Sequence, residues 1–99
     1  MNSSKNENLG SVFQTTPLKG QHALITGGSR GIGAAISNAL AALGATISLL
    51  ARDNETLKIQ DDYLKSEFGA NVFSASTDIT NEKEIVRSFK ESVNTNGPI

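Results

Sequence analysis

A glycine-rich turn at residues 26–33, with the sequence TGGSRGIG, joins a short apolar segment to one rich in alanine. Four glycines among these eight residues cost backbone entropy, so a purely structural turn explains them poorly. Between a strand and a helix, such a turn lets the backbone approach a pyrophosphate, while the helix N-terminus offers free N–H groups and the positive end of its dipole. The turn therefore predicts an α/β fold that holds a dinucleotide.

Short apolar runs predict three buried strands, at residues 22–26, 45–51 and 71–77. After each run, apolar residues recur at three- and four-residue spacing, which predicts a helix. Right-handed crossovers turn this order into the first half of a Rossmann-type doubly wound parallel sheet, with three strands and three helices. We expect the first strand to be innermost in the whole sheet, so these 99 residues alone expose an apolar edge and apolar helix faces.

The first and third predicted helices each carry one apolar stripe. In the first helix the stripe runs over residues 32–43, and Gly44 is expected to close the helix. In the third helix Ile85, Phe89 and Val93 are spaced by four. Both stripes are typical of amphipathic helices.

The second and third predicted helices carry N-cap signals. Asp53 or Asn54 is expected to cap the second helix, and Thr80 or Asn81 the third, because their short polar side chains accept hydrogen bonds from free N–H groups.

Length and composition restrict the class of protein. The 99 residues make one domain at most, and we expect residues 1–17 to be a flexible N-terminal extension and residues 18–99 the N-terminal half of a dinucleotide-binding domain in a longer protein.

The net charge of −1 argues against nucleic acid or a membrane surface as partner. The absence of cysteine excludes thiolate metal sites and fits a cytoplasmic location. The longest apolar run, residues 39–45, is far shorter than the roughly 20 residues of a membrane span.

Two other glycine motifs do not fit the turn. A phosphate-binding P-loop needs lysine followed by serine or threonine after its last glycine, but Ala34 and Ala35 follow Gly33. The G-x-G-x-x-G fingerprint fails as well, because Ile36 stands where its third glycine is required. The spacing is instead T-G-x-x-x-G-x-G.

This spacing resembles the cofactor motif of the short-chain dehydrogenase/reductase family, and in particular its 3-oxoacyl carrier-protein reductase-like branch. The lead-in at residues 18–25 (LKGQHALI) is similar to that of the family, and residues 78–80 (DIT) resemble its acidic position after the third strand. The similarity runs over residues 18–99. It implies that Gly27 makes the tight exit from the first strand and that residues 31–33 bring backbone to the pyrophosphate.

The resemblance also implies a role for Asp78. Its carboxylate would accept a hydrogen bond from the adenine amino group, with the Ile79 backbone beside it. A plain N-cap of the third helix is the alternative for Asp78, and both roles are compatible with each other.

The end of the second predicted strand indicates which cofactor is bound. A free 2′-hydroxyl requires a carboxylate there, whereas a 2′-phosphate requires arginine. The family's acidic position aligns with Ala51, and Arg52 follows it, so NADP is favoured over NAD. Arg30 is a second cationic candidate. Asp53 could reach the ribose and favour NAD, although its position also suits a helix cap. The candidate cofactor-binding residues are Thr26, Gly27, Ser29, Arg30, Gly31, Ile32, Gly33, Ala51, Arg52, Asp78 and Ile79.

The resemblance implies catalysis by a tyrosine that acts as a general acid, assisted by a lysine four residues later and by a serine. These 99 residues contain no such set. The single tyrosine, Tyr63, is followed by Glu67 at that spacing, and the lone His22 suggests neither a metal site nor a catalytic base. We therefore expect the catalytic residues beyond Ile99.

The resemblance implies an NADP-dependent oxidoreductase that transfers hydride between nicotinamide and a ketone or secondary alcohol, as a homo-oligomer (tetramer or dimer). Two alternatives remain: a non-catalytic dinucleotide-binding sensor, and an NAD-preferring dehydrogenase of the same family.

Overall fold

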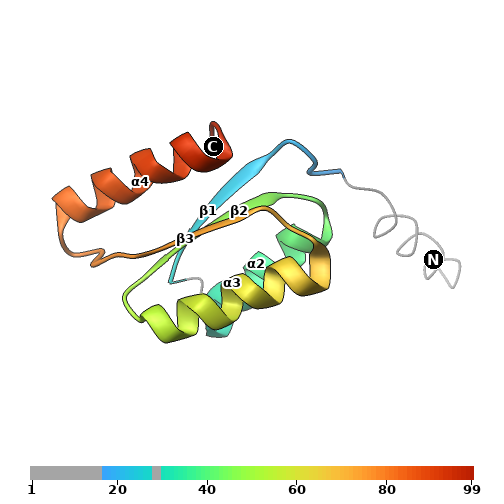
Figure 1. The fold of residues 1–99 in the computed structure, drawn as a ribbon, viewed down its shortest axis with the longest axis horizontal. Helices are drawn as coiled ribbons and strands as arrows, with labels where there is room; N and C mark the ends of the chain where they lie inside the picture. The colour runs from blue at the N-terminus through green and yellow to red at the C-terminus, as the bar shows by residue number, and fades with distance from the viewer. Residues whose placement is uncertain (1–16, 28–29) are drawn as a thin grey trace, which may run out of the picture.

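The computed structural model, which describes residues 17–27 and 30–99, is a three-stranded sheet with helices on both faces (Figure 1). The predicted N-terminal extension lies outside the described residues apart from Pro17. The elements in chain order are β1 (His22–Thr26), α2 (Gly31–Ala42), β2 (Thr46–Ala51), α3 (Asn54–Phe68), β3 (Val72–Ser76) and α4 (Glu82–Asn96).

The three strands are parallel and follow the order β1-β2-β3. Leu24 of β1 lies opposite Ser48 of β2, which in turn lies opposite Phe73 of β3. Each predicted strand agrees with the observed one to within one residue at either end. The predicted half of a Rossmann-type sheet is confirmed. Within the described part of the chain, β1 and β3 are the edges of the sheet.

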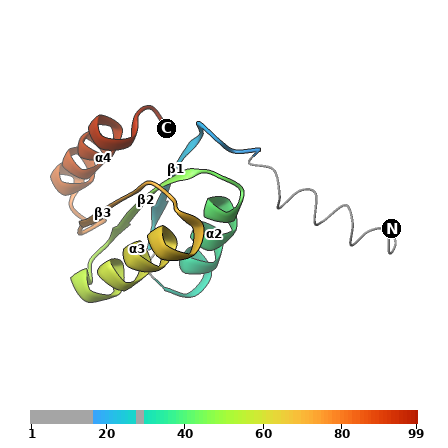
Figure 2. The ribbon, with the colours of Figure 1, turned by 45° about the vertical axis from the view of Figure 1, so that its right-hand side comes forward.

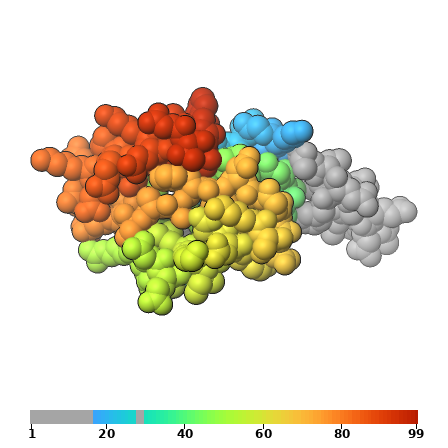
Figure 3. Space-filling model, in the orientation of Figure 1, coloured from blue at the N-terminus to red at the C-terminus, as the bar shows by residue number. Residues whose placement is uncertain are grey.

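Helices α2 and α3 cover one face of the sheet, and α4 covers the other (Figures 1 and 2). The larger core lies between the sheet and the α2–α3 layer. Alternate residues of β2, Ile47 and Leu49, point into it and are fully buried. The edge strand β3 and the segments beside it, drawn in orange, reach the surface between α3 and α4 (Figure 3). The buried core residues are Ala41, Ala45, Ile47, Leu49, Leu57 and Leu64.

The helix ends follow the predicted signals closely. Asp53 caps α3 and Asn81 caps α4, each by accepting hydrogen bonds from two backbone N–H groups of the first turn. Gly69 ends α3 in the left-handed conformation, with φ +63°. Helix α2 ends one residue earlier than predicted, because Leu43 is its C-cap and Gly44, at φ +98°, is the first residue beyond it.

Much of the apolar stripe of α2 and of α4 is exposed, although Leu40 of α2 packs against the core. Ile32 and Phe89 are 80% and 46% exposed, whereas Ser37 of α2 and Ser88 of α4 are fully buried. Ser37 packs against α3, where its hydroxyl accepts a hydrogen bond from Gln60 Nε2 at 2.9 Å. Small serine side chains let the helices approach their neighbours closely, and local hydrogen bonds satisfy the hydroxyls. The expected exposure of apolar helix faces is therefore present.

A buried polar cluster joins β1, β2 and the end of α4, which lie side by side (Figure 1). His22 Nδ1 lies 2.8 Å from the carbonyl oxygen of Gly97, and Nε2 lies 2.6 Å from Ser48 Oγ. Asn96 Nδ2 donates to the same hydroxyl at 3.3 Å. Because a carbonyl only accepts, Nδ1 donates to Gly97, and Nε2 shares the second hydrogen bond with Ser48 Oγ. His22 therefore has a structural place, as its sequence position suggested.

Candidate dinucleotide-binding site

The predicted site residues gather at one edge of the sheet, where the carboxyl ends of the parallel strands meet (Figure 1). Thr26 is the exposed last residue of β1, and Ala51 is the half-buried last residue of β2. Arg52 and Asp78 follow β2 and β3 directly or after one residue. In open α/β sheets, ligands bind in the crevice at this edge. The fold thus brings the parts of the predicted site together from three separate loops.

Two glycines of the turn adopt backbone conformations that favour glycine. Gly27 and Gly31 have φ +66° and +62°, and a Cβ added at either would meet nothing within 4 Å. The N–H of Gly27 donates to the carbonyl of Leu50 at 2.7 Å, which ties the strand exit to β2. Gly33 lies in the first turn of α2. The space in front of the turn is open, as close approach of a ligand to backbone requires. Ser29 lies outside the described residues.

In the part of the chain that the structure describes, no side-chain cap is present at the N-terminus of α2. Its N-cap residue, Arg30, makes no side-chain cap, and the first turn holds no acidic residue. By contrast, α3 and α4 are capped by Asp53 and Asn81 and carry acidic residues in their first turns. The first N–H groups of α2 and its positive dipole end are therefore available to an anion.

Two arginines flank this edge, and each is paired with a carboxylate from a neighbouring loop. Arg30 Nη2 lies 3.5 Å from Asp53 Oδ2, and Arg52 Nη2 lies 3.2 Å from Asp78 Oδ2. The arginine side chains are 73% and 74% exposed. Ion pairs this exposed contribute little to stability, typically about 0–1 kcal/mol. Either guanidinium can therefore leave its carboxylate for a phosphate at small cost.

Asp78 is held as an anion by its surroundings. Its Oδ1 accepts from the hydroxyl of Thr80 at 2.6 Å and from the Thr80 N–H at 2.9 Å. These two hydrogen bonds, with the Arg52 guanidinium as a smaller cause, lower the pKa of Asp78 below its ordinary value of 3.8. An ionised carboxylate is an acceptor only, which is the property needed to receive an amino group. The alternative prediction, that Asp78 is the N-cap of the third helix, was wrong. Asn81 is the N-cap of α4, because it stands directly before the first helical residue.

The loop after β3 contains a contact that the sequence prediction missed. Glu84 Oε1 accepts from the backbone N–H of Asp78 at 2.9 Å, so the first turn of α4 braces the loop. The pattern Asn81-x-x-Glu84 is typical of a capping box, in which Glu84 would accept from the N–H of Asn81. Here that N–H donates to the carbonyl of Asp78 instead, so the pattern indicated a contact of Glu84 but not its partner. Ile79 follows Asp78 and is 52% exposed.

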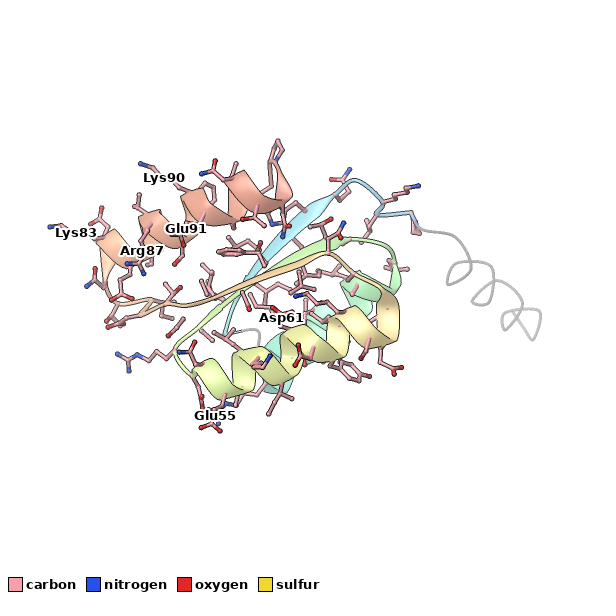
Figure 4. The ribbon with its side chains drawn as sticks, in the orientation of Figure 1. Glu55, Asp61, Lys83, Arg87, Lys90 and Glu91 are labelled. Atoms are coloured by element: carbon pink, nitrogen blue, oxygen red, sulfur yellow. The ribbon has the colours of Figure 1, made fainter. Side chains whose placement is uncertain are left out.

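An open cavity of about 1070 Å³ adjoins the Asp78 end of the edge. It begins at Asp78 and Thr80 and continues along α4 past Lys83, Arg87 and Lys90. Figure 4 shows Lys83 and Lys90 projecting from α4 away from α3. The residues described for the glycine turn do not line this cavity, so it extends the candidate site at one end only.

The Tyr63 ring lies on the surface of α3 and packs edge-on against Phe68, with ring centroids 6.0 Å apart. Residues 17–27 and 30–99 contain no cluster of three or more metal-ligating side chains. In the same residues, no helix is both long enough and apolar enough to cross a bilayer.

Comparisons with known proteins agree with this fold. The chain is 36% identical over 83 residues to a 3-dehydrosphinganine reductase of Arabidopsis thaliana, and the match covers 84% of this chain and 24% of the reductase. An L-sorbose reductase structure from Gluconobacter frateurii, complexed with NADPH and L-sorbose, matches 83% of this chain and 31% of its own, at 32% identity and a TM-score of 0.78. A short chain dehydrogenase/reductase structure from Burkholderia phymatum, in complex with NAD, matches 84% of this chain and 29% of its own, at 28% identity and a TM-score of 0.79.

The chain thus spans less than a third of the length of each of these proteins. A family model for short chain dehydrogenases matches residues 21–99. The chain therefore belongs to the short chain dehydrogenase family.

Proposed function

We propose that the protein carrying this chain is an NADP-dependent oxidoreductase acting on a ketone or secondary alcohol, and that residues 18–99 bind the adenosine and pyrophosphate part of the cofactor. The free N-terminus of α2, set between the end of β1 and two exposed arginines, is the observation that carries this proposal. The bound nicotinamide would supply or accept the hydride. Residues later in the full-length protein would supply the serine, tyrosine and lysine.

The described residues fit such a cofactor in three respects. The backbone N–H groups of residues 31–33 would bind the pyrophosphate, because no described side chain caps that end of α2. Asp78 would accept a hydrogen bond from the adenine amino group through its ionised carboxylate. The remaining described candidates would line the same edge of the sheet: Thr26, Gly27, Ala51 and Ile79. Ser29, which lies outside the described residues, stays a candidate by its sequence position alone.

NADP is favoured over NAD by the charges near the end of β2. Ala51 offers no carboxylate to a free 2′-hydroxyl, while Arg52 and Arg30 can both turn toward a 2′-phosphate. A charge-assisted hydrogen bond contributes about 1.5–3 kcal/mol, and about 1.4 kcal/mol is tenfold in affinity. Since both side chains are largely exposed, solvent screening places the preference nearer tenfold than a hundredfold.

Replacement of Arg52 tests the cofactor assignment. In the full-length protein, Arg52→Ala should weaken NADPH binding about tenfold and leave NADH binding within about twofold, because only NADPH carries the phosphate. Isothermal titration calorimetry measures both dissociation constants. Lys58→Ala, which removes an exposed cation from α3, is the matched control and should change neither. Equal losses for the two cofactors in Arg52→Ala would refute the assignment.

Turnover distinguishes the enzyme from the alternative of a non-catalytic dinucleotide sensor. The full-length protein should oxidise NADPH in the presence of simple ketones, and its later sequence should contain a serine and Tyr-x-x-x-Lys. Tight NADPH binding without turnover, in a protein that lacks those residues, would favour the sensor.

We also propose that the full-length protein is a cytoplasmic homo-oligomer. Size-exclusion chromatography with light scattering would test the oligomeric state, and fractionation of cells would test the location.

A further inference from the structure

The end of α4 contains the only asparagine–glycine sequence among the 99 residues, Asn96-Gly97. In such a dipeptide the backbone nitrogen of the glycine can attack the amide carbon of the asparagine side chain, because glycine has no Cβ to obstruct the approach. Asn96 is the last residue of α4, and Gly97 is its C-cap, with φ +86°. Both residues are half-buried. The dipeptide therefore lies where a helix ends, and helix ends fray.

In the folded chain both reacting groups are held by hydrogen bonds. The N–H of Gly97 donates to the carbonyl of Val93 at 2.8 Å, so the nitrogen that would attack is engaged in the end of the helix. Nδ2 of Asn96 donates to the Ile47 carbonyl at 3.2 Å and to Ser48 Oγ at 3.3 Å, which directs the amide toward β2. The reaction between the two groups therefore requires the last turn of α4 to open first.

The same turn is also tied to β1, beside which it lies (Figure 1). His22 Nδ1 donates to the carbonyl of Gly97 at 2.8 Å, and its Nε2 lies 2.6 Å from Ser48 Oγ. His22 is 7% exposed and Ser48 is fully buried, so water does not replace these contacts readily. The Ser48 hydroxyl is thus shared by His22 and Asn96, and its removal weakens both links to the end of α4.

We propose that Asn96 is a site of spontaneous deamidation whose rate is set by opening of the last turn of α4. The nitrogen of Gly97 loses its proton and bonds to Cγ of Asn96, the Cγ–Nδ2 bond breaks, and Nδ2 leaves as ammonia with that proton. Water then opens the cyclic imide. Cleavage at Cγ leaves aspartate, and cleavage at the backbone carbonyl leaves isoaspartate. Water is the one co-reactant, and the reaction needs no cofactor.

The product cannot restore the original contacts. A carboxylate only accepts, so at position 96 it would face the Ile47 carbonyl without a hydrogen to donate. Its charge would lie at the negative end of the α4 dipole, and the last turn of α4, which the structure describes in full, contains no basic residue. Isoaspartate also lengthens the backbone before Gly97, which displaces the carbonyl that His22 binds. Deamidation would therefore release the end of α4 from the sheet.

Peptide mapping by mass spectrometry tests the site in the full-length protein, incubated in a mildly alkaline buffer. Ser48→Ala should raise the rate of deamidation at Asn96 about three- to tenfold, because the open end of α4 becomes more populated. Ser66→Ala, at an exposed serine of α3, is the matched control and should leave the rate unchanged. Unfolding in urea should raise the wild-type rate by more than about tenfold. The exposed Asn94, which precedes threonine, should stay intact in the folded protein.

Equal rates at Asn96 in wild type and Ser48→Ala, or an Asn96 that stays intact in both, would overturn the proposal. A rate in the folded wild type as high as that in urea would overturn it as well, because the fold would then offer no control. If thermal melting shows that Ser48→Ala is unfolded, His22→Gln, which removes the ring contacts with Gly97 and Ser48, must raise the rate instead.

The variant Asn96→Asp tests the consequence of the reaction. Hydrogen exchange of the amides in the last turn of α4 should become about three- to tenfold faster than in wild type, because that turn opens more often. Asn94→Asp adds the same charge to an exposed position of the same helix and is the control. If the two variants exchange at equal rates, the release of α4 by deamidation is wrong.

Discussion

At the scale of single residues, the charge of Asp78 is set by its neighbours more than by burial. The hydroxyl and N–H of Thr80 bind one carboxylate oxygen, and Arg52 approaches the other. Because the pKa of Asp78 is lower in the folded chain than its ordinary value of 3.8, ionised Asp78 stabilises the fold. This stabilisation is fully present above about pH 4 and is lost as the pH falls below 3.8 through the folded pKa.

Thr80→Val tests that description of Asp78. Valine removes the hydroxyl, the largest cause of the shift, but keeps the backbone N–H, so the pKa of Asp78 should rise toward its ordinary value. A ¹³C NMR titration of the carboxyl group measures it directly. Thr95→Val, at an exposed position of α4, is the control and should leave the Asp78 titration unchanged. An unmoved pKa in Thr80→Val would mean that the backbone and Arg52 hold the carboxylate without the hydroxyl.

At the scale of elements, we propose that the glycine turn and the N-terminus of α2 together bind the pyrophosphate. The left-handed conformation of Gly31 and the uncapped N-terminus of α2 stand next to each other in the chain. The glycines of the turn and the first N–H groups of α2 would contact the pyrophosphate, which NADPH and NADH share. Discrimination between the two cofactors would then depend on Arg30 and Arg52.

Gly31→Ala should therefore weaken the binding of NADPH and of NADH equally, by more than about tenfold. A Cβ at φ +62° strains the turn and projects into the open space beside it. Gly20→Ala is a matched control, since Gly20 also has a positive φ of +86° and open space around it. Both variants should lose about 1–3 kcal/mol of unfolding free energy. Calorimetry should show lost binding for Gly31→Ala alone. A loss confined to NADPH would contradict a pyrophosphate role for the turn.

At the scale of the whole molecule, the two faces of the sheet are held in different ways. The α2–α3 face has an aliphatic core around β2. The α4 face uses buried polar groups, with Ser88 Oγ 2.7 Å from Thr77 Oγ1 and with the cluster of His22, Ser48 and Asn96. Polar contacts have stricter geometry than aliphatic ones, so they hold α4 in one position over β2 and β3.

Ser48→Ala should lower the free energy of unfolding by about 1–3 kcal/mol, because it leaves Nε2 of His22 and the amide of Asn96 without their shared partner. Urea denaturation of the full-length protein measures the change. Ser66→Ala, at an exposed serine of α3, should stay within about 0.5 kcal/mol of wild type. Equal stabilities for the two variants would show that the cluster does not hold the sheet and α4 together.

The sequence alone determined the order of elements, the strand positions to within one residue and the glycine turn, and it narrowed the cap of α3 to Asp53 or Asn54, since each depends on residues close together in the chain. Only the tertiary structure decided which side of each helix is buried. Periodicity reports the spacing of Ile32 or Phe89 on its own helix, but the position of the strands determines that these residues are exposed while Ser37 and Ser88 are buried. The ion pairs Arg30–Asp53 and Arg52–Asp78 could not be predicted from local sequence patterns either, because it is the parallel register of the strands that brings those loops to one edge of the sheet.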